Sequence, residues 1–368
     1  MAREEVYKKL AEHLSRLPMG YPYRDDLEEI LKENFSPDEA EIALAIPTDT
    51  IPLRAIPVEE ILEHVECTKE ALCIILERLS QQGMIYSGKT EDGEKGYALH
   101  QVGFGFPQTF FWKGEDTPHA QKMSELVAKY FNRKVTMESF SPTETKAYRY
   151  IPVGRSLEAS KQGVYPQHMM ERVVEQADII ALGHCPCRMA FKLRGFGCDH
   201  PTEVCIKFNE MARYVIDQGL AKEITKDQAL DVIKKTEMMG LVHFVDNAEG
   251  DILHNCNCCG CACWNVGNIR RRKIPRDAIM ATYFTRMTHD DDCAGCGECV
   301  GICPVNAVEM KDDIPVVDED WCIGCGVCAT VCATDAIEMI LRSDKTGQLP
   351  AATVSELHQK IMKEKGLK

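Results

Sequence analysis

The segment from Cys293 to Cys332, CAGCGECVGICPVNAVEMKDDIPVVDEDWCIGCGVCATVC, decides how the C-terminal part of this chain folds. It contains the pattern C-x2-C-x2-C-x3-C twice, first at Cys293, Cys296, Cys299 and Cys303, then at Cys322, Cys325, Cys328 and Cys332. Three thiolates at this spacing can wrap one corner of an iron–sulfur cubane, while the fourth can reach a second cluster. The pattern therefore predicts two [4Fe–4S] clusters. Two structural zinc sites are the alternative, but zinc ribbons rarely use four such graded cysteines twice.

Residues 288–342 resemble the bacterial two-cluster ferredoxin domain in both cysteine runs, in Pro304, and in the glycines among the cysteines. The resemblance implies two βαβ-like halves, with short strands on either side of a turn at 311–313. It also implies the ligand sets: Cys293, Cys296, Cys299 and Cys332 for one [4Fe–4S] cluster, and Cys322, Cys325, Cys328 and Cys303 for the other. One departure is Ala333, which stands where the family usually has proline.

Nine further cysteines lie in two patches of the middle region: Cys185, Cys187, Cys198 and Cys205 in the first, and Cys256, Cys258, Cys259, Cys261 and Cys263 in the second. So many thiols in a chain that already carries clusters indicate metal binding. We expect one or two further [4Fe–4S] clusters here; two would need eight ligands, and four from each patch is the simplest count. One patch could also lend a ligand to the other, and adjacent Cys258 and Cys259 could serve different clusters because neighbouring side chains diverge.

Structural zinc is the main rival for these nine thiols, since thiolate suits both zinc and iron–sulfur clusters. Three histidines, His184, His200 and His254, lie near the cysteines and could ligate. We expect each of them to be an ordinary surface histidine or a supporting one.

The N-terminal region predicts helices and one hairpin. Ser36-Pro37-Asp38-Glu39 is a capping box with proline at the first helical position. Two more amphipathic helices follow, and Asp92-Gly93 is a turn between two short strands. This order resembles a winged helix-turn-helix domain. That fold often binds DNA through its third helix, but this helix carries Glu70 and Glu77 and no basic cluster. We therefore expect a protein-docking module rather than a DNA reader.

Length and charge limit the classes of protein. The chain has 368 residues, enough for two or three domains, and a net charge of −14, which disfavours non-specific nucleic-acid binding. No apolar run is long enough to span a membrane, and the charged start MAREEVYKKL does not look like a signal peptide. Nineteen cysteines without an export signal suggest reduced thiolates in the cytoplasm. The basic run at residues 270–273 is either a solvated linker or charge compensation for anionic clusters.

The predicted fold class is therefore α+β and multidomain. We expect five parts: an N-terminal helical arm at 1–35, a winged-helix-like domain at 36–105, a Cys-rich α/β middle domain at 106–284, the ferredoxin domain at 285–345, and a C-terminal tail at 346–368. Within that tail, residues 356–365 could form a charged helix that ends before Gly366.

Over most of its length the chain resembles a group of 4Fe-4S binding proteins of anaerobes, through AEHLSRLPMGYP, IPVGRS and the two middle cysteine patches. The resemblance implies electron transfer within a larger oxidoreductase complex or with soluble redox partners. No residue is predicted to be catalytic, and the chain has no Walker loop and no GxGxxG fingerprint after a strand, so no nucleotide site is expected. Two alternatives are a redox-sensing winged-helix regulator and a reductase whose middle cluster has an iron atom open to substrate.

Overall fold

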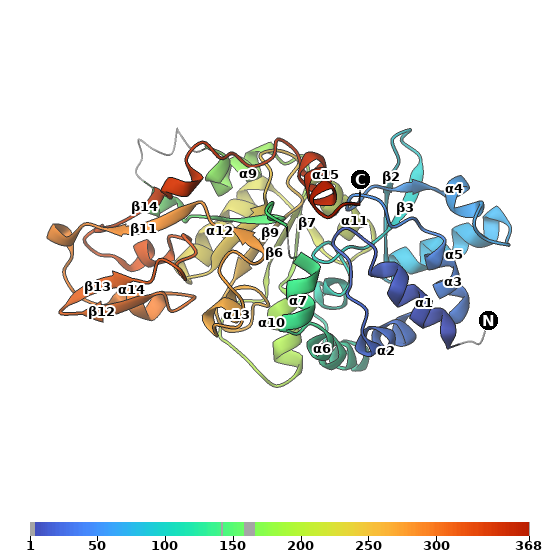
Figure 1. Cartoon of the computed structure of the whole chain (residues 1–368), viewed down its shortest axis with the longest axis horizontal. Helices are drawn as coiled ribbons and strands as arrows, with labels where there is room; N and C mark the ends of the chain where they lie inside the picture. Colours follow the sequence, from blue (N-terminus) through green and yellow to red (C-terminus); the bar gives the residue numbers. More distant parts are fainter. Residues whose placement is uncertain (1–3, 141–142, 158–165, 368) are drawn as a thin grey trace.

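The computed structural model describes residues 4–140, 143–157 and 166–367. The molecule is elongated, with the N-terminal helices at one end, the C-terminal cysteine runs at the other, and a seven-stranded sheet between them (Figure 1). Among the described residues, no helix has both the length and the apolar character needed to cross a membrane.

The N-terminal end is a small helical unit followed by a three-stranded sheet. Its helices are α1 (Glu5–Leu14), α2 (Asp25–Asn34), α3 (Pro37–Leu44), α4 (Val58–Leu62) and α5 (Lys69–Gln81), and its strands are β1 (Ile56–Pro57), β2 (Ile85–Lys89) and β3 (Lys95–Leu99). The strand order is β1-β3-β2. The predicted capping box is confirmed: the Glu39 amide donates to the Ser36 hydroxyl, and the Ser36 amide donates to the Glu39 carboxylate at 2.7 Å.

The central sheet has the order β10-β4-β8-β9-β6-β5-β7. Its strands are β4 (Tyr148–Ile151), β5 (Ile180–His184), β6 (Glu203–Phe208), β7 (Lys222–Ile224), β8 (Val242–Asp246), β9 (His254–Cys258) and β10 (Met280–Ala281). Only β10 and β4 pair in parallel; the other neighbours are antiparallel. Strands β6 and β9 are neighbours, so Cys205 of the first patch and Cys256 of the second lie in the same part of the sheet.

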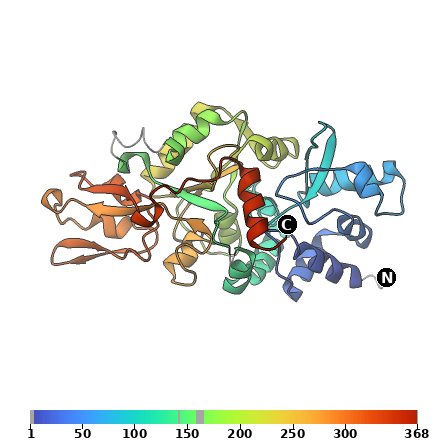
Figure 2. The same ribbon diagram turned by 45° about the horizontal axis from the view of Figure 1, so that its top comes forward.

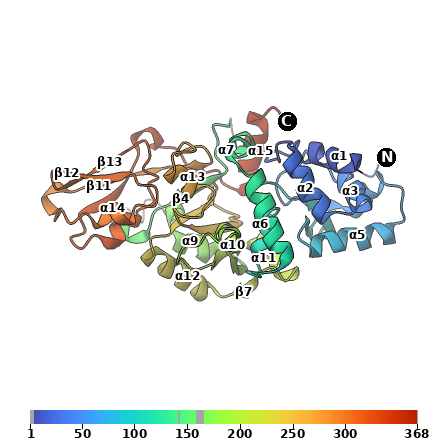
Figure 3. The same cartoon turned by 90° about the horizontal axis from the view of Figure 1, so that it is seen from below.

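Helices surround this sheet. They are α6 (Pro118–Tyr130), α7 (Arg133–Phe140), α9 (Met170–Gln176), α10 (Pro186–Leu193), α11 (Asn209–Asp217), α12 (Lys226–Met238) and α13 (Val266–Arg270), with short 3-10 turns η1 (Gln108–Phe111), η2 (Gly154–Ser156) and η3 (Pro166–His168). Helix α6 contacts both α2 and α10, so it joins the N-terminal unit to the central sheet (Figure 3).

The C-terminal cysteine runs lie in two strand–helix–strand halves. The first half contains β11 (Phe284–Thr288), α14 (Glu298–Ile302) and β12 (Val308–Lys311), and the second contains β13 (Ile314–Val317), η5 (Val327–Val331) and β14 (Ile337–Leu341). Strand β11 pairs with β14, and β12 pairs with β13. Asp312 and Asp313 both have positive φ in the tight turn between β12 and β13, where the sequence predicted a turn.

The helix expected at residues 356–365 is confirmed as α15 (Val354–Glu364). It returns to the middle of the molecule and lies between the sheet and the N-terminal helices (Figure 2). Its Leu357 and Ile361 side chains are buried, and the ammonium of Lys365 donates to the Pro18 carbonyl at 2.6 Å and the Ser139 carbonyl at 3.0 Å. The apolar face of the helix thus packs into the molecule.

Candidate iron–sulfur and metal centres

Four C-terminal thiols line one small cavity between the two halves: Cys303, Cys322, Cys325 and Cys328. Cys303 follows α14 in the first run, whereas the other three belong to the second run. The structure thus brings together the same four thiols that the ferredoxin resemblance grouped, including the one exchanged between runs.

The surroundings of this cavity fit an anionic cluster. Arg286 lines it, is only 5% exposed, and its two terminal nitrogens have no hydrogen-bond partner in the part of the chain that the structure describes. Burial raises the pKa of Cys328 to about 12, and the guanidinium of Arg286 opposes that rise. A buried cation without a partner is costly, so a negatively charged cluster held by these thiolates would complete the site.

The other four C-terminal thiols lie around α14 and after η5. Cys293 and Cys296 are on the loop before α14, Cys299 is buried in α14, and Cys332 follows η5. Gly295, between the first two, has a φ of 64°, and a Cβ there would lie 2.8 Å from the Asp313 carbonyl oxygen. A glycine is therefore required where this loop turns.

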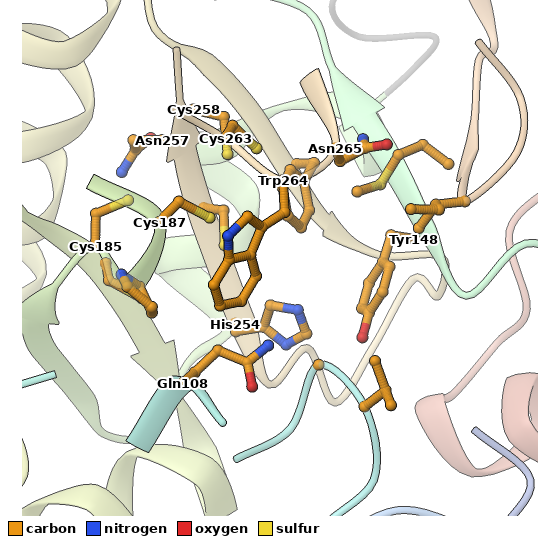
Figure 4. Close-up of a pocket in the computed structure, with 18 of the residues that line it drawn as sticks. Gln108, Tyr148, Cys185, Cys187, His254, Asn257, Cys258, Cys263, Trp264 and Asn265 are labelled. Carbon is orange, nitrogen blue, oxygen red and sulfur yellow. The ribbon is translucent and has the colours of Figure 1, made fainter. Parts of the chain in front are cut away.

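The nine middle thiols divide into two groups, but not patch by patch. Six of them surround a cavity of about 120 Å³: Cys185, Cys187, Cys205, Cys256, Cys258 and Cys263. They come from the start of α10, from β6 and β9, and from the loop before α13. Figure 4 shows Cys185, Cys187, Cys258 and Cys263 gathered on one side of this cavity. Three of these thiols come from each patch, so the structure groups them differently from the four per patch of our simplest count.

These six thiols are close enough to perturb one another in a continuous series, in the order Cys185, Cys187, Cys263, Cys258, Cys256, Cys205. Interactions with neighbouring thiols lower the pKa of Cys256 and Cys263 well below the usual value and raise the pKa of Cys258 well above it. A metal cluster would let all of them ionise, because thiolate is the ligating form.

The opposite wall of the cavity is polar and aromatic. Figure 4 shows Gln108, His254 and Tyr148 there, with the Trp264 indole between them and the thiols. The Tyr148 hydroxyl is buried and has no hydrogen-bond partner among the described residues. The Nδ1 atom of His254 lies 3.4 Å from a carboxylate oxygen of Asp246, and the ring packs edge-on against Tyr148.

The remaining three middle thiols form a separate group with a histidine. The ligand atoms of Cys198, His200, Cys259 and Cys261 all lie within 4.8 Å of one another, and the Sγ atoms of Cys198 and Cys259 are 4.0 Å apart. We expected His200 to be an ordinary histidine, and the structure places it among possible metal ligands instead. The signal available in the sequence was the Cys198-x-His200 spacing opposite Cys259-x-Cys261.

Cys258 and Cys259 face different groups. Successive side chains of extended backbone point to opposite sides, so Cys258 at the end of β9 faces the cavity while Cys259 faces Cys198. The sequence had left this as one option for adjacent cysteines.

Arg188 lies between the two groups of middle thiols. It is 3% exposed, its Nη1 donates to the Asn257 carbonyl at 3.0 Å, and its Nε and Nη2 lack partners within the described ranges. Burial alone would lower the pKa of Arg188, but the Cys185 and Cys259 thiolates raise it above its usual value. The guanidinium therefore supplies positive charge to both groups.

The C-terminal cysteine domain packs directly on the middle cysteines. The Val153 amide donates to the Cys325 carbonyl at 3.0 Å. A Cβ on Gly260, between Cys259 and Cys261, would lie 2.1 Å from the Pro304 carbonyl oxygen, so the two loops touch through their backbones.

The basic run at residues 270–273, at the end of α13, contacts backbone carbonyls on both sides of this interface. Arg271 donates to the Cys261 carbonyl at 3.0 Å, and Arg272 donates to the carbonyls of Val305 and Asn306. Residues 271–273 are exposed to solvent, and both arginines contact backbone carbonyls beside cysteines rather than acidic side chains.

Comparisons with known proteins match the C-terminal part of the chain. The family described as "4Fe-4S dicluster domain" matches residues 292–336. The chain is 37% identical over 43 residues to a ferredoxin from Mycolicibacterium smegmatis, and equally so to one from Saccharopolyspora erythraea. These residues are 12% of the chain and 41% of each relative, so the chain spans less than half the length of the curated relatives it matches. No solved structure matches the chain. The chain therefore carries a ferredoxin-type 4Fe-4S domain at residues 292–336, which supports a role in iron–sulfur electron transfer.

Proposed function

We propose that this protein relays electrons between the two clusters of its ferredoxin domain and a third iron–sulfur cluster held in the six-thiol cavity. The main support for this proposal is that six buried or half-buried thiols from four segments line one cavity. Four thiolates suffice for a cubane, so six can hold one cluster with two further thiols beside it.

The link between the centres is short. Strand β4 begins at Tyr148, which lines the six-thiol cavity, and five residues later the Val153 amide binds the Cys325 carbonyl in the ferredoxin domain. Extended chain rises about 3.3 Å per residue, so this stretch spans roughly 17 Å. On the thiol side the two regions are in contact, because Gly260, between the cavity residues Cys258 and Cys263, touches the Pro304 carbonyl next to Cys303. This proximity suits electron transfer between them.

Iron analysis tests the proposal. Protein purified without air should contain roughly twelve iron atoms per chain, four for each of three cubanes. The triple variant Cys187→Ala, Cys258→Ala, Cys263→Ala leaves three thiols at the cavity, so its iron should fall to roughly eight while the ferredoxin EPR signals remain. The matched control, Cys67→Ala, removes a half-buried thiol of the N-terminal unit and should keep all the iron. Unchanged iron in the triple variant would refute the third cluster.

We infer that the N-terminal unit contains a winged helix, with α5 as the third helix of that fold, and that it binds a redox protein partner in the cytoplasm. The cations of α5 are already paired: Lys69 with Glu59, and Arg78 with Glu39 at 2.8 Å. DNA phosphates would have to compete with these carboxylates, which disfavours the regulator alternative. Ile74 on the same helix is 67% exposed and suits an apolar protein contact within an oxidoreductase complex.

A reductase is the second candidate, supported by the polar wall of the six-thiol cavity. The unpartnered Tyr148 hydroxyl and the unpartnered Asn265 Oδ1 (neither with a hydrogen-bond partner among the described residues) both line it, so a small polar molecule could bind beside the cluster. Addition of cyanide to the dithionite-reduced protein should then change the EPR signal of the third cluster alone. Identical spectra with and without cyanide would count against a reductase.

A further inference from the structure

The second group of middle thiols points to a different metal chemistry from the rest of the protein. We propose that Cys198, His200, Cys259 and Cys261 bind a single zinc ion, separate from every iron–sulfur centre. This site does not depend on the electron-transfer role, because it contains none of the six thiols around the cavity.

The spacing of the ligand atoms favours one ion over a cluster. A tetrahedral zinc ion with Zn–S bonds of about 2.3 Å holds its sulfur ligands about 3.8 Å apart. A cubane binds each thiolate to a different iron atom and spreads the sulfurs to roughly 6 Å. Here the Cys198 and Cys259 sulfurs are 4.0 Å apart, and all four ligand atoms lie within 4.8 Å of one another. A cubane would not fit inside this group without moving its ligands outward.

The donor set also suits zinc. Three thiolates and one imidazole form a Cys3His set, which is typical of closed structural zinc sites with no open position for substrate. The Ala262 amide lies 3.5 Å from the Cys259 sulfur and donates to it. This contact suits a ligating sulfur, because it places a positive dipole beside the negative charge of a thiolate.

The position of the site gives it a structural role. Zinc would tie the segment after α10, which carries Cys198 and His200, to the loop after β9, which carries Cys259 and Cys261. Gly260 lies between the last two ligands and touches the Pro304 backbone of the ferredoxin domain. The ion would thus hold the loop against which the ferredoxin domain packs.

Elemental analysis of the full-length chain, purified without air from medium containing iron and zinc, tests this proposal. We expect one zinc atom per chain. His200→Ala and Cys261→Ala should each reduce zinc at least tenfold and leave the iron content within a tenth of the wild-type value. Cys73→Ala removes a thiol far from the site, in α5, and should keep the zinc. Loss of iron rather than zinc in the first two variants would overturn the proposal, as would wild-type protein that contains no zinc.

A further variant, His200→Cys, tests the site without removing a possible ligand, so its result does not depend on whether the first two variants misfold. His200→Cys offers four thiolates and should keep one zinc atom. After exchange of zinc for Co²⁺, this variant should show stronger thiolate-to-cobalt absorption than the wild type, because a fourth sulfur joins the ion. Identical cobalt spectra of wild type and His200→Cys would show that residue 200 is not a ligand and would overturn the site as drawn. The iron count of the six-thiol cavity is read separately, so either proposal can fail alone.

Discussion

At the scale of single residues, Arg286 is a buried cation whose position suits a negatively charged cluster. It is buried, its terminal nitrogens lack hydrogen bonds to described residues, and it lines the cavity of Cys303, Cys322, Cys325 and Cys328. A nearby positive charge favours the more negative, reduced form of a cluster. We therefore expect Arg286→Met to lower the reduction potential of that cluster by the order of 50 mV, near the 59 mV that equals a tenfold change for one electron.

An EPR-monitored redox titration separates the two ferredoxin clusters and checks this expectation. Only one of the two signals should move in Arg286→Met. Arg286→Lys keeps the charge and should stay close to the wild-type potential. If both variants shift equally, the effect comes from packing and not from the charge of Arg286.

At the scale of elements, the loop between β9 and α13 decides how the ferredoxin domain packs on the sheet. Gly260 in this loop touches the Pro304 carbonyl so closely that a methyl group has no room. Overpacking of this kind costs about 1–3 kcal/mol. We expect Gly260→Ala to lower the free energy of unfolding by that amount, measured by denaturant titration without air.

Gly301 in α14 is the matched control for Gly260. A Cβ there meets no atom within 4 Å, so Gly301→Ala should leave stability unchanged or raise it by up to about 1 kcal/mol through helix propensity. Equal stabilities of the two variants would contradict a tight contact between the loops.

The elements also show what the sequence could predict. Local signals were sufficient for the capping box at Ser36 and for the turn at Asp312, because each depends on a few adjacent residues. The grouping of the middle thiols was not predictable in this way. It depends on the antiparallel order β9-β6-β5, which places Cys256 near Cys205 although the two lie in different patches. Likewise, the sequence predicted the C-terminal helix but not where it packs, because its partners Pro18 and Ser139 are distant in the chain.

At the scale of the whole molecule, three buried histidines tie stability to pH. Burial lowers the pKa of His100, His168 and His358 to about 3 each. In the unfolded chain each has a pKa near 6.5, so between these values the unfolded state binds protons that the folded state does not. The contribution of these histidines to the free energy of unfolding is therefore fully present above pH 6.5, and it is lost as the pH drops toward 3. Each histidine contributes about 1.4 kcal/mol per pH unit well below 6.5.

His358 allows a direct test, because neither of its ring nitrogens has a hydrogen-bond partner in the described structure and its ring packs on Phe104. We expect His358→Phe to remove one proton from the pH dependence without losing a hydrogen bond. Denaturant titrations at pH 7.5 and 5.5 should show a stability loss smaller than that of the wild type by about 1 kcal/mol. Acid damage to the clusters affects both proteins and cancels in this difference. A wild-type slope in His358→Phe would mean that His358 also takes up its proton in the folded state.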